Sequence, residues 1–522
     1  MELTLKIIEV IAALVAVAIF LFLKLRTMGF RGKNYPPGPK TIPILGNALD
    51  FPTRFPHIKF TEWARQYGDI YSLKILNRTI VVVSSAPAVK EVLDSNGART
   101  GNRPYSVIVQ RVTQGNLIAL EDMDNPTWRR GRKAIHTFNT EKRLASQLPM
   151  QNTEYSQFLH DALEDPGNIF EHIRRTTVGV MMMVLYGSRV TKYKDTEAEA
   201  YFQGAKMLNQ LTDPGAHPPV DLFWPLQYVP KRWAYWKRLA DEARALRNKV
   251  YISLCRRCEQ AIEQEKMTGC YVEDLLLNQQ QLGMSTREIG GLAGGMMDGG
   301  AETSAAFLSN FVLALINHPD VQERGQREVD TAVGPNRWPT LEDYDRLPYI
   351  RAIVDETHRF RPVFPIGLPH MSSKEVNYKG YHIPEDSLIF MNTYGIFHDP
   401  NMYEDPETFN PERFLKTPFG TKEGVDTQGY RDNLVFGAGR RICPGEALAR
   451  RSIALNAMNL LWAFNFKKDG SGTGDMDTES YAQPGIELAP KRFTCDIAPR
   501  SAEKAQMVRD RYEKAFPIEV NS

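Results

Sequence analysis

One cysteine of the chain lies in a segment that could hold a sulfur anion. Gly437 and Gly439 precede Cys443 and Gly445 follows it, which permits tight backbone geometry around the sulfur. Pro444 lacks an N–H and can begin a helix, and free N–H groups at a helix N-terminus stabilise a thiolate. The segment suits either a nucleophilic cysteine or a thiolate ligand of a metal cofactor, and it lacks the partner ligands that zinc requires.

The other four cysteines give no comparable signal. Cys255 and Cys258 have the spacing of a metal or redox pair, but they lie in a charged helical stretch with no second pair, so we interpret them as ordinary helix residues. Cys270 and Cys495 have no partner pattern. Five cysteines in 522 residues argue against a disulfide framework and for a reducing compartment.

A glycine-rich stretch and a charged pair could position a cofactor. Six of the eleven residues from 290 to 300 are glycine. Each glycine costs a helix about 1 kcal/mol relative to alanine, so the stretch indicates that a bulky group, such as a flat cofactor, approaches the backbone closely. Farther along, Glu356 and Arg359 share one helix face, although Glu62 and Glu171 have the same spacing to an arginine.

Together these motifs resemble the cytochrome P450 superfamily. The segment 436–445 looks like the haem loop of that family, whose cysteine is the axial ligand of the haem iron, and Glu356, Arg359 and the downstream Arg413 resemble its Glu-Arg-Arg triad. The resemblance implies a mainly α fold with a minor β-sheet, haem b as the cofactor, and Cys443 as the metal ligand. The triad would have a structural role, locking the core behind the haem.

The resemblance also assigns roles to individual residues around the haem. Residues 299–304 resemble the oxygen-activation motif, in which Thr303 would open the helix by bonding a carbonyl one turn back and Glu302 would supply protons. Arginine suits a carboxylate, such as a haem propionate. The implied haem-binding residues are Trp128 and Arg132 at one propionate, Arg441 at the other, His370 as a further basic partner, and Phe436 and Gly439 in the loop.

The N-terminal segment predicts a membrane anchor. Residues 10–23 form an unbroken apolar run, and residues 3–23 can span a hydrocarbon core of roughly 30 Å. Basic residues follow the run, which places its C-terminal side in the cytosol by the positive-inside rule, and no signal-peptide cleavage site follows it. We therefore expect a single-pass transmembrane signal anchor over residues 3–23. The resemblance implies the endoplasmic reticulum membrane, with the catalytic domain facing the cytosol.

The remaining chain predicts a hinge and one large domain. Residues 24–50 are basic and proline-rich, which favours a stiff, extended hinge. Residues 51–522 contain no repeat and no long linker, so we expect one haem-thiolate catalytic domain. Strands are predicted within residues 69–84, 379–391 and 486–497. The main predicted helices cover residues 128–138, 155–163, 170–186, 233–268, 285–317, 347–359 and 446–464.

Composition and motifs bound the expected partners. The 64 lysines and arginines balance 62 acidic residues, a net charge of +2, so charge gives no argument for a nucleic-acid partner. The chain shows no nicotinamide or flavin motif, so its electrons must come from outside. The resemblance implies a monooxygenase that inserts one atom of O₂ into a small apolar substrate. Its electrons would come from NADPH through NADPH-cytochrome P450 reductase, with cytochrome b5 as an optional second donor.

Two alternatives differ in class from a monooxygenase. Some relatives isomerise or dehydrate peroxides without a reductase, and a membrane haem carrier would not be an enzyme. The presence of Thr303 beside Glu302 favours the monooxygenase over both. The chain most resembles fungal microsomal members, which indicates secondary-metabolite biosynthesis. Substrate contacts are expected from residues 103–120, with Met296, Met297, Phe364, Ile366 and Ile486 as candidates for an apolar pocket.

Overall fold

The backbone divides into two compact units. The computed structural model describes residues 11–16, 19, 20, 23, 25, 27–212, 217–482 and 487–516. Unit 1 comprises the chain up to Asn102, Ile366–Ile396 and Ala438–Arg440, and unit 2 comprises Arg103–Pro365, Phe397–Gly437 and the chain from Arg441 onward. The predicted single domain over residues 51–522 stays a prediction.

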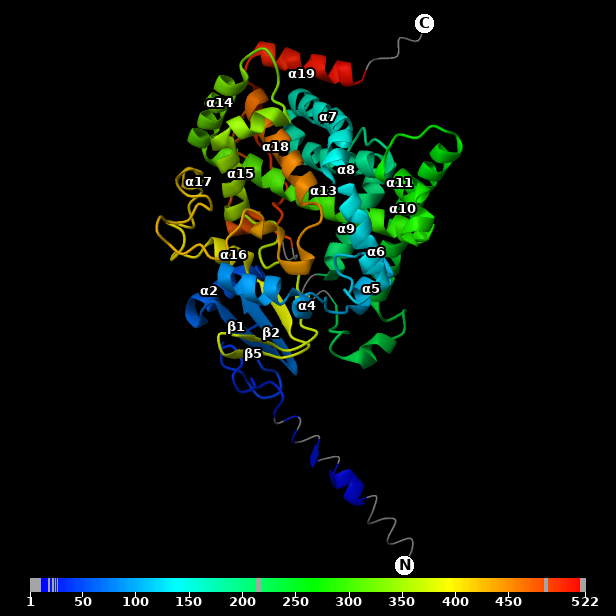
Figure 1. Cartoon of the computed structure of the whole chain (residues 1–522), viewed down its shortest axis with the longest axis vertical. Helices are drawn as coiled ribbons and strands as arrows, with labels where there is room; N and C mark the ends of the chain where they lie inside the picture. The colour runs from blue at the N-terminus through cyan, green and yellow to red at the C-terminus, as the bar shows by residue number, and fades with distance from the viewer. Residues whose placement is uncertain are drawn as a thin grey trace, which may run out of the picture. The chain divides into compact units, whose positions relative to one another are not determined.

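Unit 1 is built on a four-stranded sheet in the order β1–β2–β6–β3 (Figure 1). β1 (Ile70–Ile75) and β2 (Arg78–Val83) pair antiparallel across a two-residue turn, which confirms the strands predicted within residues 69–84. β6 (Leu388–Met391) joins β2 in parallel, and β3 (His370–Met371) pairs antiparallel with β6. β2 is buried along nearly its whole length, as expected for a continuous apolar run inside a sheet.

Two strands lie within the predicted range 379–391, but they do not pair with each other. β5 (Tyr381–Ile383) pairs with β4 (Val376–Tyr378) instead, and β6 leaves to join β2. The pairing of β6 with a strand about three hundred residues earlier has no local signal, because the parallel arrangement depends on the chain between them. The helices of unit 1 are α2 (Pro56–Tyr67), α3 (Ala86–Val89), a π-helical turn (Lys90–Ser95), α4 (Gly97–Thr100) and α16 (Thr393–Phe397).

The proline-rich part of the predicted hinge packs against this sheet. The Ser72 hydroxyl donates to the carbonyl of Pro36 at 2.6 Å, and the Ser72 N–H donates to the carbonyl of Pro37 at 2.7 Å. Pro36 and Pro39 are buried. This part of residues 24–50 therefore belongs to the folded unit and is not a free linker.

The N-terminal apolar segment is described only in part. Residues 3–10, 17, 18, 21 and 22 of the predicted anchor lie outside the described residues. Residues 11–16, 19, 20 and 23 are helical, and Leu14, Phe20 and Leu23 are exposed over more than half of their surface. The anchor itself stays a prediction.

Unit 2 is mainly helical, as predicted. Its helices are α5 (Val107–Thr113), α6 (Pro126–Phe138), α7 (Glu141–Glu164), α8 (Ile169–Tyr186), α9 (Thr196–Thr212), α10 (Tyr235–Glu263), α11 (Tyr271–Leu277), α12 (Gln279–Leu282), α13 (Thr286–Asn317), α14 (Pro319–Val333), α15 (Pro348–Phe360), α17 (Arg413–Lys416), α18 (Glu446–Ala463) and α19 (Ala502–Ala515). Short 3-10 turns lie at Pro166–Asn168, Trp224–Tyr228, Leu341–Arg346, Leu434–Phe436 and Thr478–Ser480, and a further one, Gly439–Arg441, begins in unit 1. β7 (Phe464–Lys467) pairs antiparallel with β8 (Asp496–Pro499).

Local signals account for several helix boundaries. Ser285 caps α13, and Glu288 completes the predicted capping box. α10 ends at Glu263, short of the predicted boundary at 268, because Glu265 and Gly269 adopt left-handed backbone angles. α7 begins fourteen residues before the predicted start at 155 and runs through Pro149.

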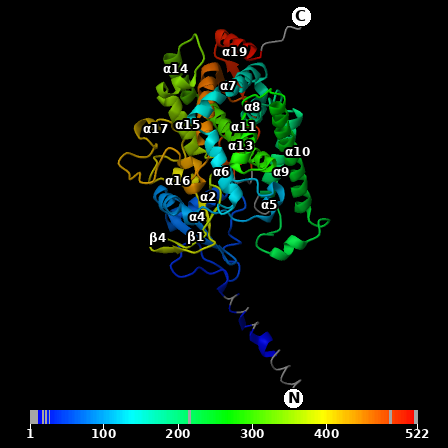
Figure 2. The same ribbon diagram turned by 45° about the vertical axis from the view of Figure 1, so that its right-hand side comes forward.

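Helix α13 forms the centre of unit 2. It packs against α8, α10, α15 and α18, and Figure 1 shows it passing between them. α10 lies alongside α9, as Figure 2 shows. Among the described residues, α13 alone is long and apolar enough to cross a membrane, but it is mostly buried inside the protein. Its apolar length therefore reflects a core position.

Candidate active site

The cysteine loop presents Cys443 directly before α18. The N–H of Cys443 donates to the carbonyl of Phe436 at 2.9 Å, which closes the loop on itself. Gly437 adopts a φ of 95°, a region that L side chains avoid. Burial raises the pKa of the Cys443 thiol, while the N–H of Gly445 and the Arg132 charge oppose that rise. A lasting thiolate here therefore needs a further positive charge, which a metal ion would supply.

Gly439 is required by its conformation and by its neighbours. Its φ is 58°, and a Cβ at this position would collide with the carbonyl oxygen of Leu93. Its N–H donates to Oδ1 of Asp94 at 2.6 Å. These contacts lie within unit 1. Gly439 therefore allows the loop to pack closely against the chain around Leu93.

Three buried or half-buried arginines lie near the cysteine loop, with Arg103 close to Arg441. Arg132 Nη2 donates to the carbonyl of Ile442 at 2.7 Å. Arg441 donates to backbone carbonyls and lies 4.8 Å from the ring centre of Trp128. Arg103, which the sequence did not single out, donates to the carbonyl of Ala119 at 3.0 Å. A lone arginine before a proline carries no sequence signal of such a role.

Electrostatics favours an anion beside these arginines. Burial and the Arg441 charge lower the pKa of Arg103 to about 9, and burial lowers the pKa of Arg441 to about 10. Burial also lowers the pKa of Arg132. Desolvated guanidinium groups gain most from a carboxylate, which they can bind through two hydrogen bonds. The cluster therefore suits a ligand with buried carboxylates.

His370 lies in unit 1. It is buried at the start of β3, and its Nδ1 lies 2.9 Å from the carbonyl oxygen of Thr100. Because the arginine cluster belongs to unit 2, the role of His370 as a propionate partner stays a prediction.

Thr303 and Glu302 occupy the middle of α13. The Thr303 hydroxyl donates to the carbonyl of Gly299 at 2.7 Å, one turn back. No atom lies within 4 Å of a Cβ placed on Gly299, so this part of the helix faces open space. Arg174 of α8 pairs with Glu302 at 3.1 Å. Burial raises the pKa of Glu302, and the Arg174 charge opposes that rise. Thr303 and Glu302 thus place a hydroxyl at an open face of the helix next to an acid with a raised pKa.

Three of the six glycines in the stretch 290–300 are closely approached by side chains of the protein itself. A Cβ on Gly294 would collide with the Tyr251 ring, and one on Gly300 would lie 2.5 Å from Sδ of Met181. A Cβ on Gly291 would lie 2.5 Å from the Asn116 side chain. The sequence correctly predicts that something approaches the backbone closely. At these three positions it is a side chain of the protein itself and not a cofactor. Gly299 remains the position where open space would admit a cofactor.

The triad of Glu356, Arg359 and Arg413 forms a buried network. Glu356 pairs with Arg359 at 2.7 Å and with Arg413 at 3.2 Å, and it accepts from the N–H of Asn410. All three charged side chains are at most 7% exposed. Both arginines also donate to backbone carbonyls, including that of Thr408. The network ties α15 to the chain before α17.

The predicted pocket residues are placed one by one, and the pocket that they would form stays a prediction. Met297 is fully buried in the core around α13 and α8, with Met296 packed against the same core. Phe364 packs against a second core, around α15 and α18. Ile366 lies in a core of unit 1, and Ile486 lies outside the described residues.

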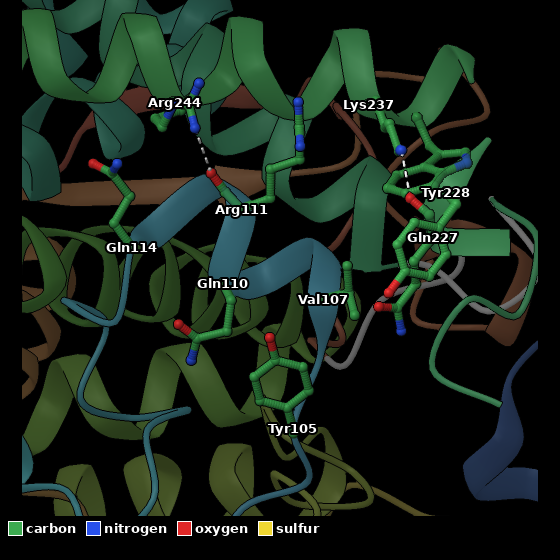
Figure 3. A pocket seen from close by; sticks show the side chains of 10 residues that line it. Tyr105, Val107, Gln110, Arg111, Gln114, Gln227, Tyr228, Lys237 and Arg244 are labelled. Carbon is green, nitrogen blue, oxygen red and sulfur yellow. Dashed lines mark hydrogen bonds between the residues drawn. The ribbon is translucent and has the colours of Figure 1, made fainter. Parts of the chain in front are cut away.

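A pocket of about 530 Å³ opens between α5 and α10 (Figure 3). Arg111 and Arg244 line it and share Asp241, while Lys237 donates to the carbonyl of Gln227. Its α5 side falls in the region 103–120, where substrate contacts are expected. Its lining is more polar than the apolar pocket that the sequence predicts.

Two of the remaining cysteines meet in space. Sγ of Cys258 in α10 lies 3.8 Å from Sγ of Cys270 at the start of α11, and both thiols are buried. The sequence predicts no partner for Cys270, because the turn between α10 and α11 creates this contact. Within the described residues, no group of three or more histidine, cysteine or acidic side chains could hold a metal ion.

The residues present fit a haem group. Cys443 is half-buried beside Arg132, burial lowers the pKa of both Arg132 and Arg441, and α13 offers open space at Gly299. A cofactor with one metal ion, two carboxylates and a flat face could bind the sulfur of Cys443, pair with the arginines and fill the open space at Gly299. These features belong to unit 2.

Comparison with known proteins gives one family. The family model of cytochrome P450 matches residues 36–495. Cytochrome P450 monooxygenase ple5B of Rhodocybe pseudopiperita is 39% identical over 505 residues, covering 95% of each chain. Cytochrome P450 monooxygenase yanC of Aspergillus niger is 35% identical, covering 92% of this chain and 93% of that protein. A zebrafish cytochrome P450 solved with abiraterone matches with a TM-score of 0.69 at 26% identity, covering 85% of this chain and 100% of that chain. The chain therefore belongs to the cytochrome P450 family of monooxygenases.

Proposed function

We propose that this monooxygenase holds haem b through Cys443 and oxidises a small apolar substrate with O₂ and electrons from NADPH. The observation that carries the proposal is the placement of Cys443, on a loop closed by Phe436 and directly before α18. When bound, a haem with a thiolate ligand supplies an electron-rich iron that favours O–O cleavage. Arg132, Arg441 and Trp128 would hold its propionates.

Thr303 and Glu302 would handle protons on the opposite side of the site. The Thr303 hydroxyl is held by the Gly299 carbonyl and can orient water in the open space there. Glu302 is close to Arg174 and can exchange a proton with that water. This arrangement favours the monooxygenase over a peroxide isomerase or dehydratase, which would need no proton supply for O₂.

A reductase and a membrane complete the proposed system. A flavoprotein of the NADPH-cytochrome P450 reductase class would supply electrons, with cytochrome b5 as an optional second donor. The exposed apolar side chains of residues 11–16, 19, 20 and 23 support a membrane anchor, since water would otherwise cover them. We place the protein in the endoplasmic reticulum membrane, with its body in the cytosol.

The substrate is proposed only as a class. The fungal sources of the relatives support a role in a fungal biosynthetic pathway for secondary metabolites. Zebrafish cytochrome P450 structures with abiraterone and with progesterone support an apolar, ring-containing substrate. An apolar polycyclic scaffold is therefore the first class to screen, by the spin shift that binding produces.

The test is the difference spectrum of the reduced protein with carbon monoxide. The full-length protein is expected to show the long-wavelength band of a thiolate-ligated haem, and Cys443→Ala is expected to lose it. Cys495→Ala, which removes another buried thiol, should keep the band. A wild-type protein that binds haem without this band would overturn the proposal.

A further inference from the structure

The polar pocket between α5 and α10 has no role in the proposed haem chemistry. Its volume of about 530 Å³ is within the range of small-molecule sites. Figure 3 shows the Arg111 side chain extending from α5 toward α10, where Arg244 and Lys237 also line the pocket. Seven residues, about two turns of helix, separate the two α10 cations, so they share one face. The pocket therefore collects three cationic side chains from two helices of unit 2.

One carboxylate, that of Asp241, serves both arginines. It accepts from Nη2 of Arg111 at 2.8 Å and from Nη2 of Arg244 at 3.1 Å. Lys231, which is outside the lining, pairs with the same carboxylate at 2.6 Å. Burial raises the pKa of Asp241, but the hydrogen bonds from Arg111 and Lys231 outweigh burial and lower it. Asp241 is therefore ionised at neutral pH, and it balances one of the three positive charges that contact it.

Lys237 adds a charge that no acid balances. Its Nζ donates to the carbonyl of Gln227 at 2.6 Å and to the carbonyl of Val229 at 2.8 Å. Among the described residues, no carboxylate pairs with this ammonium group. The carbonyl oxygens hold it in place but carry no full charge. Three lining cations against the single charge of Asp241 leave an excess of two positive charges at the pocket.

Two other acids reach the lining, but they contact uncharged groups. Glu121 accepts from the Gln110 side chain at 3.0 Å. Asp221 accepts from the N–H of Val107, the first residue of α5, at 2.8 Å. Within the part of the chain that the structure describes, Asp241 is the acid with which the lining arginines pair.

Arg111 keeps hydrogen-bond donors for a ligand. Its Nη2 binds Asp241, while its Nε is buried and has no hydrogen-bond partner among the described residues. A buried donor without a partner is rare enough to require an explanation. A guanidinium has five N–H donors in a planar fork, which matches the two oxygens of a carboxylate. The Arg111 side chain is 32% exposed, so it can serve Asp241 and a bound anion together.

The same pocket has apolar and aromatic surface. Val107 and Trp236 line it, together with the rings of Tyr105 and Tyr228. An inorganic anion would use only the cations and would leave this surface in contact with water. An organic acid would pair its carboxylate with the arginines and cover the apolar groups with its body. Charge and surface together therefore favour an organic acid.

We propose that the pocket between α5 and α10 is a binding site for a small organic acid with an apolar or aromatic body. Its carboxylate pairs with Arg111 and Arg244, and its body lies against Trp236. The contacts that carry this inference involve neither Cys443 nor Thr303, so it holds independently of the proposed function.

Isothermal titration calorimetry of the purified full-length protein in a non-ionic detergent tests the site. The probe is 2-naphthoate, and 2-naphthamide is its uncharged match. The acid is expected to bind at least about tenfold more tightly than the amide, because a hydrogen bond to a charged group contributes about that factor. Added sodium chloride should weaken the binding of the acid and leave that of the amide unchanged.

Four variants locate the binding. Arg111→Gln and Arg244→Gln each remove one cation, so each should weaken the binding of 2-naphthoate about tenfold and leave that of 2-naphthamide unchanged. Arg244→Lys keeps the charge without the fork and should retain part of the affinity. Lys249→Gln removes an exposed cation of α10 that is outside the lining, and it should match the wild type. The melting temperature of each variant confirms that it is folded.

Three results would overturn the inference. The first is equal affinity of the wild type for the acid and the amide. The second is unchanged affinity for 2-naphthoate in both glutamine variants, which would place the acid elsewhere in the protein. The third is tighter binding of inorganic phosphate than of 2-naphthoate, which would show a plain anion site with no use for an apolar body.

Discussion

At the scale of single residues, burial separates glutamates that have the same spacing to an arginine. Glu62 is exposed and pairs with Lys59, and Glu171 pairs with Arg492. Glu356 instead pairs with Arg359, three residues on, inside the core. The spacing alone predicts only that two side chains share a helix face. Which pair becomes a structural network depends on the chain packed over it.

The Glu356 network should contribute strongly to stability. Glu356→Ala leaves Arg359 and Arg413 buried without their carboxylate, so the free energy of unfolding should fall by about 3–5 kcal/mol. Urea unfolding followed by circular dichroism measures this. Glu62→Ala breaks an exposed pair with Lys59 and should change stability far less. Equal losses in the two variants would contradict a special role for the buried network.

The cysteine and arginine residues of the site differ in how far sequence could identify them. Cys443 has a dense motif around it, because the tight loop needs glycine at several nearby positions. Arg103 has no such motif, because its guanidinium reaches the site through packing of a distant segment.

At the scale of elements, α13 combines two requirements in one glycine-rich segment. Gly291, Gly294 and Gly300 admit side chains of neighbouring segments, and Gly299 borders open space. The sequence shows that close approach is needed but not what approaches, because glycine offers no side chain that reveals its neighbour. The structure therefore divides a single sequence signal between helix packing and the site.

This division predicts opposite effects of two identical substitutions. Gly294→Ala would drive a methyl group into the ring of Tyr251, which is held by Asp298, so the melting temperature should fall. Gly299→Ala meets no atom within 4 Å and gains helix propensity, so it should be at least as stable as the wild type. Differential scanning calorimetry compares them. A melting temperature in Gly299→Ala as low as in Gly294→Ala would refute the division.

At the scale of the whole molecule, two segments are apolar enough to suggest a membrane span. α13 is mostly buried between other helices, whereas the described apolar side chains of residues 11–23 are exposed. Hydropathy cannot separate these cases, because a core helix and a membrane helix both avoid water. Exposure separates them and supports the N-terminal segment as the anchor.

Removal of residues 1–27 should therefore release the protein from membranes. The remaining chain keeps the packed segment around Pro36 and the complete loop of Cys443, so it should retain the carbon monoxide band. Centrifugation of expressing cells after carbonate washing measures the distribution, with the full-length chain as control. A truncated chain that stays in the carbonate-washed membrane would show that the anchor lies elsewhere.

The sequence by itself determined the features that depend on near neighbours. These are the cysteine loop, the Ser285 cap of α13 and the β1–β2 hairpin, because each is set by backbone angles and hydrogen bonds within a few residues. Only the tertiary structure decided the pairing of β2 with β6, the arginine cluster, and the ion pair of Arg174 with Glu302. Each of these joins distant segments, and their contact depends on how the intervening chain buries its apolar surface.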